Sequence, residues 1–113
     1  RDYHLLLDDQ ATQIYGITDA IAERVRKTGN VTLRSVGDIA RRQTLKDNDA
    51  DYVAPGDMLA ELREDNLKLV ESFRAVKQAA EDAGDNATSG IVDEWTDQAE
   101  ERAWFLFEAS RKG

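Results

Sequence analysis

Cysteine is absent from the 113 residues of this chain, and proline and histidine occur once each. The lack of cysteine excludes disulfides and thiolate metal sites and permits a reducing compartment, so we expect a cytoplasmic protein. No apolar run approaches the roughly 18 residues of a membrane-spanning helix, and no signal-peptide pattern is present, so we expect no membrane partner. The length favours a single domain.

Acidic residues outnumber basic residues by 23 to 15, which gives a net charge of -8. Direct DNA binding requires clustered Lys and Arg. Here the basic clusters are short: Arg24 to Lys27, Arg41 with Arg42, and Arg111 with Lys112. The charge therefore does not support DNA as a partner. Because negative potential concentrates cations, a protein that handles metal ions is the simpler interpretation.

Apolar residues recur every three or four positions through residues 1–28, which predicts a long amphipathic helix packed in a bundle. This apolar seam consists of Leu7, Ala11, Ile14, Thr18, Ile21 and Val25. A polar stripe runs beside it and consists of His4, Asp8, Tyr15, Asp19 and Glu23. At about 100° per residue, Asp8, Asp19 and Glu23 share one face of the helix, with His4 at its edge.

The polar stripe holds metal-binding side chains that one copy of the helix cannot bring together. Asp19 and Glu23 are one turn apart and can bind one ion, whereas His4 lies about 22 Å from Asp19 along the axis. Two antiparallel copies related by a two-fold axis near Thr12 would place His4 of one copy opposite the carboxylates of the other, and symmetry would make the site twice. Imidazole and carboxylates suit iron, manganese or zinc.

Taken singly, each of these side chains is equally consistent with a solvated surface. Glu23, for example, can pair with Lys27 one turn further along the helix. The metal hypothesis depends on the shared face and on the spacing that requires a second copy.

The run H-x14-D-x3-E on a long helix, followed by AER and a glycine break, resembles the second bundle helix of the Dps family of ferritin-like mini-ferritins. The later DMLAELREDN and WFLFEA resemble the last two bundle helices of that family. The resemblance covers essentially the whole chain. It implies an all-α, ferritin-like four-helix bundle, a hollow dodecamer, and ferrous iron oxidised at sites shared across a subunit two-fold.

The ligands that the resemblance implies are His4, Asp19 and Glu23, which would act as the ferroxidase residues, with Asp8 as a further metal ligand. The family also has a histidine ligand on a preceding helix, and no residue precedes Arg1. We therefore expect residues 1–113 to form one ferritin-like domain that lacks the first bundle helix.

The connection after the first helix is expected to contain a short helix over residues 36–43, which Ser35 would cap. In the family this helix lies within the long crossover that a ferritin-like topology requires. The acidic loop at 46–57 resembles the start of a calcium loop, but Tyr52 replaces the required glycine and Met58 the required glutamate. A solvated loop is the better interpretation.

Two further helices follow. The first spans residues 56–82, and its expected seam consists of Leu59, Leu62, Leu69, Phe73, Val76 and Ala80, with Asn66 in the gap. Asn66 is expected to be a satisfied structural amide that fixes register or bonds across the core. The last helix would be capped by Thr88 or Ser89 and would run to about residue 111. Its expected inner positions are Val92, Trp95, Ala99, Arg102 or Ala103, and Leu106.

The last helix has two notable surface features, an aromatic end and an acidic first half. Trp104, Phe105 and Phe107 make its end apolar on several sides, which favours a neighbouring subunit there. Acidic residues crowd its first half. They are interpreted either as a solvated face with favourable charge at a helix start or, as in ferritin-like cages, as the lining of an iron-admitting pore made by Asp85, Asp93 and Asp97.

The function that follows from the resemblance is an iron-oxidising and iron-storing protein. It would consume Fe(II) and hydrogen peroxide and so protect DNA from oxidative damage. Two alternatives come from other classes: a purely structural helical bundle, and a nucleoid-associated protein that compacts DNA without iron chemistry.

Overall fold

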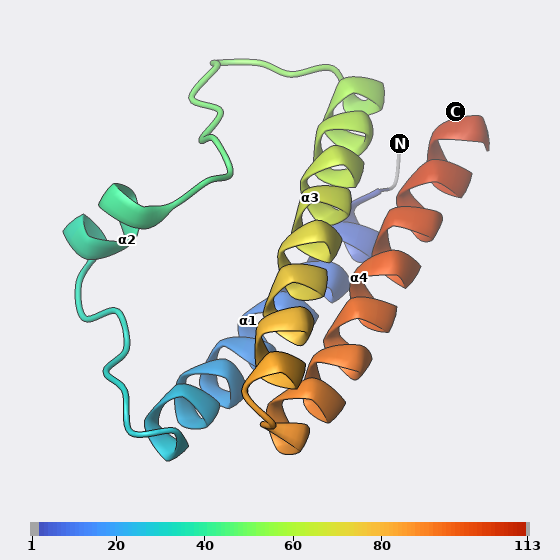
Figure 1. Cartoon of the computed structure of the whole chain (residues 1–113). Helices are drawn as coiled ribbons and strands as arrows, with labels where there is room; N and C mark the ends of the chain where they lie inside the picture. Colours follow the sequence, from blue (N-terminus) through green and yellow to red (C-terminus); the bar gives the residue numbers. More distant parts are fainter. Residues whose placement is uncertain (1–2, 113) are drawn as a thin grey trace. The chain divides into compact units, whose positions relative to one another are not determined.

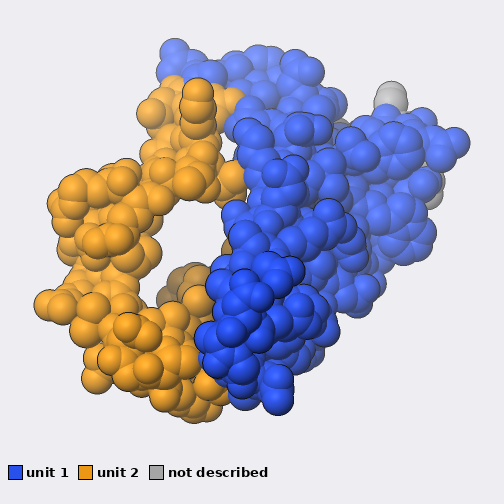
Figure 2. Space-filling model, viewed as in Figure 1, with its two compact units in different colours: residues 1–3, 50–113 blue, residues 4–49 orange. Residues whose placement is uncertain are grey.

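The computed structural model describes residues 3–112, which are helical apart from their connections. The helices are α1 (His4–Lys27), α2 (Val36–Arg42), α3 (Pro55–Asp82) and α4 (Asn86–Lys112), and α2 lies within the long connection between α1 and α3 (Figure 1). The described part of the chain contains no strand. The expected all-α class and the short crossover helix are both confirmed. Figure 2 shows two compact units, residues 4–49 and residues 1–3 with 50–113.

Local sequence signals set most helix ends. The Oγ of Ser35 accepts a hydrogen bond from the backbone N–H of Asp38 at 3.0 Å, which confirms the expected cap of α2. Pro55 occupies the first turn of α3, where its missing N–H costs nothing. Gly29 ends α1 with φ of 88°, a conformation that favours glycine.

The start of α4 differs from the expectation that Thr88 or Ser89 would cap it. The helix begins at Asn86, and Asp85 is its cap: Asp85 Oδ1 accepts the N–H of Thr88 at 3.1 Å. The Thr88 hydroxyl instead donates to Asp85 Oδ2 at 2.6 Å. A carboxylate accepts these bonds more strongly than a hydroxyl and also complements the helix dipole, so Asp85 is the cap in preference to Thr88 or Ser89.

The hairpin of α3 and α4 holds the core of its unit. Its buried apolar residues are Leu59, Val70, Phe73, Ala80, Val92, Trp95, Ala99, Ala103 and Leu106. All the inner positions expected on α4 are buried. On α3 the expected seam is partly wrong: Val70 is buried, whereas Leu62 and Val76 are 36% and 44% exposed. A single partner helix covers only a narrow stripe of α3, and these two side chains lie beside that stripe.

Asn66 makes the polar link across this hairpin. Its Oδ1 accepts a hydrogen bond from Nε of Arg102 at 2.8 Å, and its Nδ2 donates to the Leu62 carbonyl at 2.9 Å. Asn66 and Arg102 are 5% and 1% exposed, and burial lowers the pKa of Arg102. The expectation of a satisfied amide that bonds across the core is confirmed.

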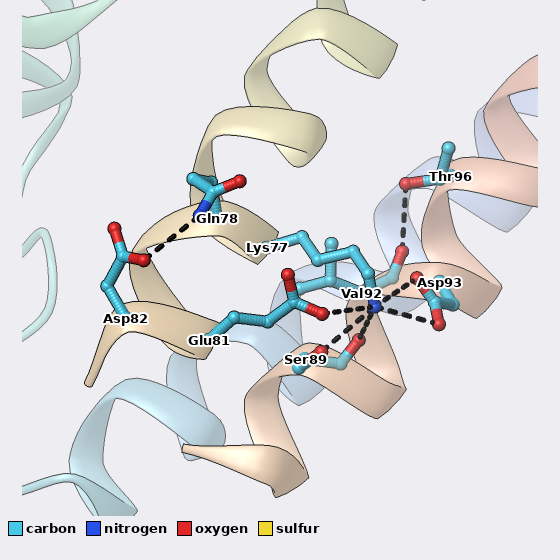
Figure 3. A network of polar contacts seen from close by, with 8 residues as sticks. All are labelled: Lys77, Gln78, Glu81, Asp82, Ser89, Val92, Asp93 and Thr96. Carbon is cyan, nitrogen blue, oxygen red and sulfur yellow. Dashed lines mark hydrogen bonds and ion pairs between the residues drawn. The ribbon is translucent and has the colours of Figure 1, made fainter. Parts of the chain in front are cut away.

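Lys77 links the two helices at the end of the hairpin where the turn joins them (Figure 3). Its Nζ lies 3.0 Å from Asp93 Oδ1 and 2.9 Å from Ser89 Oγ on α4, and 3.7 Å from Glu81 on its own helix. The hydrogen bond to Asp93 is the main reason that the pKa of Lys77 is raised. One cation therefore links the last turns of α3 to the first turns of α4.

Candidate metal centre

The first end of the polar stripe is a histidine–carboxylate pair. His4 Nε2 lies 3.2 Å from Asp8 Oδ2, one turn along α1, and both side chains are mostly exposed. Such a pair fixes the orientation of an imidazole and leaves its other nitrogen, Nδ1, available to a metal ion. The structure thus brings together two of the four metal ligands that were expected from sequence.

The other end of the stripe holds Asp19 and Glu23, which are both exposed on later turns of α1. A continuous helix from His4 to Lys27 keeps Asp19 about 22 Å from His4 along its axis. Among the described residues, no group of three or more His, Asp or Glu side chains is close enough to hold a metal ion. One chain therefore carries two partial donor sets, and their pairing across a two-fold stays a prediction.

The apolar seam of α1 is less buried than its spacing suggests. Ala11, Ile14 and Thr18 are exposed, and Leu7, Ile21 and Val25 are half-buried. Gln10 is the buried residue of this helix. An amphipathic helix with a half-exposed seam has apolar surface available to another molecule.

Asp19 also lines an apolar hollow of about 520 Å³ within the unit of residues 4–49, and sequence reasoning missed it. The α1 wall runs from Thr18 to Val25, and the opposite wall consists of Val31, Thr32, Leu33 and Ile39. We call this the crossover hollow. The turn at Gly29 sends the chain back along α1, with Asn30 N donating to Val25 O at 3.2 Å. The apolar residues that follow Gly29 were the available signal.

Two of the three residues proposed for an iron-admitting pore have structural partners within the chain. Asp85 caps α4, and Asp93 pairs with Lys77, whereas Asp97 is exposed. The pore remains a prediction. Of its three proposed residues, Asp97 is the one that neither caps α4 nor pairs with Lys77 in the described part of the chain.

The aromatic end of α4 is also exposed. Trp104, Phe105 and Phe107 are 57%, 40% and 41% exposed, and the guanidinium groups of Arg63 and Arg111 lie 5.1 and 5.6 Å from the centre of the Phe107 ring. Large aromatic side chains exposed together are typical of an interaction surface. The expected neighbouring subunit at this position stays a prediction.

A model of the ferritin-like domain matches residues 1–112. The chain belongs to this family. The match spans α1, α2, α3 and α4, so the polar stripe lies within a ferritin-like domain.

Curated relatives place the chain further within this family. It is 29% identical over 107 residues to an uncharacterised low-temperature-induced protein of Nostoc, which covers 94% of this chain and 60% of the relative. A homologue of that protein in Anabaena variabilis gives the same values. The chain is also 26% identical over 106 residues to DNA protection during starvation protein 1 of Deinococcus radiodurans, which covers 94% of this chain and 51% of the relative.

These values show distant homology to a Dps protein. The chain spans between half and three-fifths of the length of these relatives. No solved structure matches it significantly. No helix in the part described by the structure is long and apolar enough to cross a membrane.

Proposed function

We propose that this ferritin-like chain binds and oxidises ferrous iron at sites shared between two copies of α1. The observation that carries the proposal is the division of one mixed donor set between the ends of a single helix. His4 and Asp8 lie at one end, and Asp19 and Glu23 lie at the other. Membership of the ferritin-like family supports iron as the substrate, and the imidazole–carboxylate chemistry fits it.

Each donor has a distinct role in this proposal. Asp19 and Glu23 supply two carboxylates one turn apart, which bind the cation and offset its charge. His4 supplies a neutral nitrogen from the second copy, through the atom that Asp8 leaves free. The exposure of these side chains in the single chain leaves them accessible to a hydrated cation and to a second protein copy.

The reaction is a balanced two-electron transfer. Two ferrous ions each give one electron to one molecule of hydrogen peroxide, two protons are taken up, and two ferric ions and two water molecules form. The product would be stored as mineral inside a homo-oligomer, which we propose is a dodecamer. Removal of both reagents of hydroxyl-radical chemistry would protect DNA, a role that agrees with the name of the Deinococcus relative.

The direct test replaces both carboxylates, as Asp19→Asn with Glu23→Gln, and follows ferric absorbance after ferrous salt and peroxide are mixed. Asp9→Asn is the matched control, because Asp9 is an exposed carboxylate of the same helix outside the polar stripe. We expect at least about a hundredfold slower oxidation in the double variant and little change in the control. Equal rates in the two variants would exclude Asp19 and Glu23 as the site, and wild-type oxidation no faster than in buffer alone would favour a purely structural bundle.

A mixing experiment tests whether the site is shared. His4→Ala chains and Asp19→Asn/Glu23→Gln chains are inactive alone, but a mixed pair has one intact site out of two. With equal co-expression and random pairing, half of the pairs are mixed, so about a quarter of the wild-type sites are intact. A donor set contained within one chain predicts no recovery.

A salt-dependent gel shift with duplex DNA addresses the remaining alternative. Tight DNA binding together with iron oxidation no faster than in buffer alone would favour a DNA-compacting protein without iron chemistry. Such a result would remove α1 as the reaction site.

A further inference from the structure

The positive charge of this acidic chain is concentrated where α1 ends and the crossover begins. Residues 24–46 carry seven basic residues and one acidic residue, whereas the rest of the chain carries eight basic and twenty-two acidic residues. The four proposed iron ligands all precede residue 24, so this positive charge has no part in binding a cation. A basic segment in an acidic protein attracts small anions instead.

A pocket within this segment gathers three of its arginines. It has a volume of about 570 Å³ and lies within the unit of residues 4–49. Its charged lining consists of Arg34, Arg41, Arg42 and Asp38, and the hydroxyl groups of Thr32 and Ser35 add neutral donors. We call it the arginine pocket. It is distinct from the crossover hollow, whose charged lining residue is Asp19.

Asp38 holds two of the guanidinium groups in place. Its Oδ1 accepts hydrogen bonds from Arg41 Nη2 at 3.1 Å and from Arg42 Nε at 3.4 Å. The Asp38 side chain is 22% exposed, whereas those of Arg41 and Arg42 are 71% and 70% exposed. The carboxylate therefore lies behind the two cations and orients them, and most of their five N–H donors each still face solvent.

The remaining groups of the pocket are also available to a ligand. Arg34 is exposed and makes no hydrogen bond or ion pair within the part of the chain that the structure describes. In the same part, Oδ2 of Asp38 has no hydrogen-bond partner, because both arginines bind Oδ1. The pocket thus offers guanidinium donors on one side and a carboxylate acceptor on the other.

This combination fits hydrogenphosphate better than other anions. Guanidinium groups bind phosphate oxygens through paired, charge-assisted hydrogen bonds. Three guanidinium groups and one carboxylate give the pocket a net charge that balances the roughly −1.5 to −2 of a phosphate group at neutral pH. Hydrogenphosphate also keeps a proton that Asp38 can accept, whereas sulfate and the phosphodiesters of nucleic acids carry none at that pH.

We propose that the arginine pocket binds inorganic phosphate. Arg34, Arg41 and Arg42 bind its oxygens, and Asp38 both orients two of these arginines and accepts the phosphate proton. The pocket shares no residue with the polar stripe of α1, so the phosphate site stands whether or not the chain oxidises iron. A DNA duplex is the less suitable occupant, because its closely spaced charges would be repelled by a chain of net charge -8.

Isothermal titration calorimetry of the iron-free protein with sodium phosphate, in about 0.1 M chloride, tests the site. We expect a Kd below about 1 mM for the wild type, and binding at least about tenfold weaker in Arg41→Gln with Arg42→Gln. Both side chains are mostly exposed, so the fold should be retained, and circular dichroism checks this. No measurable binding by the wild type would overturn the proposal.

Arg26→Gln with Lys27→Gln is the matched control. It removes the same charge from exposed side chains of the same basic segment, and neither residue lines the pocket. Its affinity for phosphate should change by less than about twofold. Equal weakening in the two double variants would show a general attraction to the basic segment and would refute the pocket.

A charge-conserving variant tests the geometry of the guanidinium groups. Arg41→Lys with Arg42→Lys keeps both charges but removes the paired donors, so we expect phosphate to bind at least about threefold more weakly. An unchanged affinity would contradict binding through paired hydrogen bonds. Amide chemical shifts provide a second readout: phosphate should perturb residues 31–42 and leave residues 4–23 unchanged, and the opposite pattern would overturn the assignment.

Competing anions identify the source of the phosphate group. Sulfate should bind at least about fivefold more weakly than phosphate at neutral pH, because it has no proton for Asp38. Duplex DNA at the same concentration of phosphate groups should not displace the free ion. Equal binding of sulfate would reduce the pocket to an unselective anion patch, and displacement by DNA would assign it to a nucleic-acid backbone; either result would overturn the proposal.

Discussion

The buried pair of Asn66 and Arg102 gives the sharpest stability prediction. Asn66→Leu keeps the side-chain volume nearly constant but removes the acceptor that lies 2.8 Å from Arg102 Nε. It also removes the donor to the Leu62 carbonyl. Arg102 is 1% exposed, so water cannot replace the lost acceptor without opening the hairpin. The substitution therefore tests whether this polar link stabilises the α3–α4 hairpin.

The magnitude follows from the type of bond. A hydrogen bond to a charged group contributes about 1.5–3 kcal/mol, and burial of the new leucine returns part of that loss. We expect Asn66→Leu to lower the free energy of unfolding by about 2 kcal/mol, and to lower Tm by roughly 8 °C. Replacing both polar groups, as Asn66→Leu with Arg102→Met, should recover much of the loss, because the buried guanidinium whose Nε lost its acceptor is then removed as well.

Urea denaturation followed by circular dichroism measures these differences. Gln78→Leu is the control, because this amide is exposed and bonds to Asp82 on the surface of α3. That control should change stability by less than about 0.5 kcal/mol. The reasoning is refuted if Asn66→Leu costs no more than the control, or if adding Arg102→Met makes the protein still less stable.

Three further predictions concern the same hairpin. Lys77→Met should lower Tm at neutral pH. Because the pKa of Lys77 is raised above 10.5 on folding, the stabilisation by its charge should disappear only as pH rises through that raised value. Thermal melts of both proteins at several pH values test this. Asp85→Ala should cost about 1 kcal/mol in urea denaturation, since it removes the cap of α4. In Trp95→Phe, the emission of Trp104 should shift to shorter wavelength as protein concentration rises, if a neighbour covers this exposed ring.

Sequence periodicity predicted the buried positions correctly where one face of a helix packs against one partner helix. Every inner position expected on α4 is buried, because those residues meet α3 along a single stripe. On α3 the same reasoning included Leu62 and Val76 and omitted Val70. Spacing alone identifies an apolar side of a helix that is wider than the stripe one partner covers, so it cannot choose among neighbouring positions.

The capping residue of α4 was harder to predict from sequence than its buried positions. Thr88, Ser89 and Asp85 are all good capping residues, and only the backbone geometry shows that α4 starts early enough for Asp85 to accept the Thr88 N–H. The crossover hollow was missed for a related reason. It forms because the turn at Gly29 returns the chain along α1, and a hydropathy pattern does not contain the direction of a turn.

The candidate site shows what a helix can encode by itself. Spacing fixed the separation of His4 from Asp19, and the continuous helix from His4 to Lys27 maintains it. The imidazole and the carboxylates of a donor set so divided can meet at one ion only when a second helix supplies the missing end. Iron chemistry at this site would therefore depend on association, and the residues that control association would control the reaction without contacting the metal.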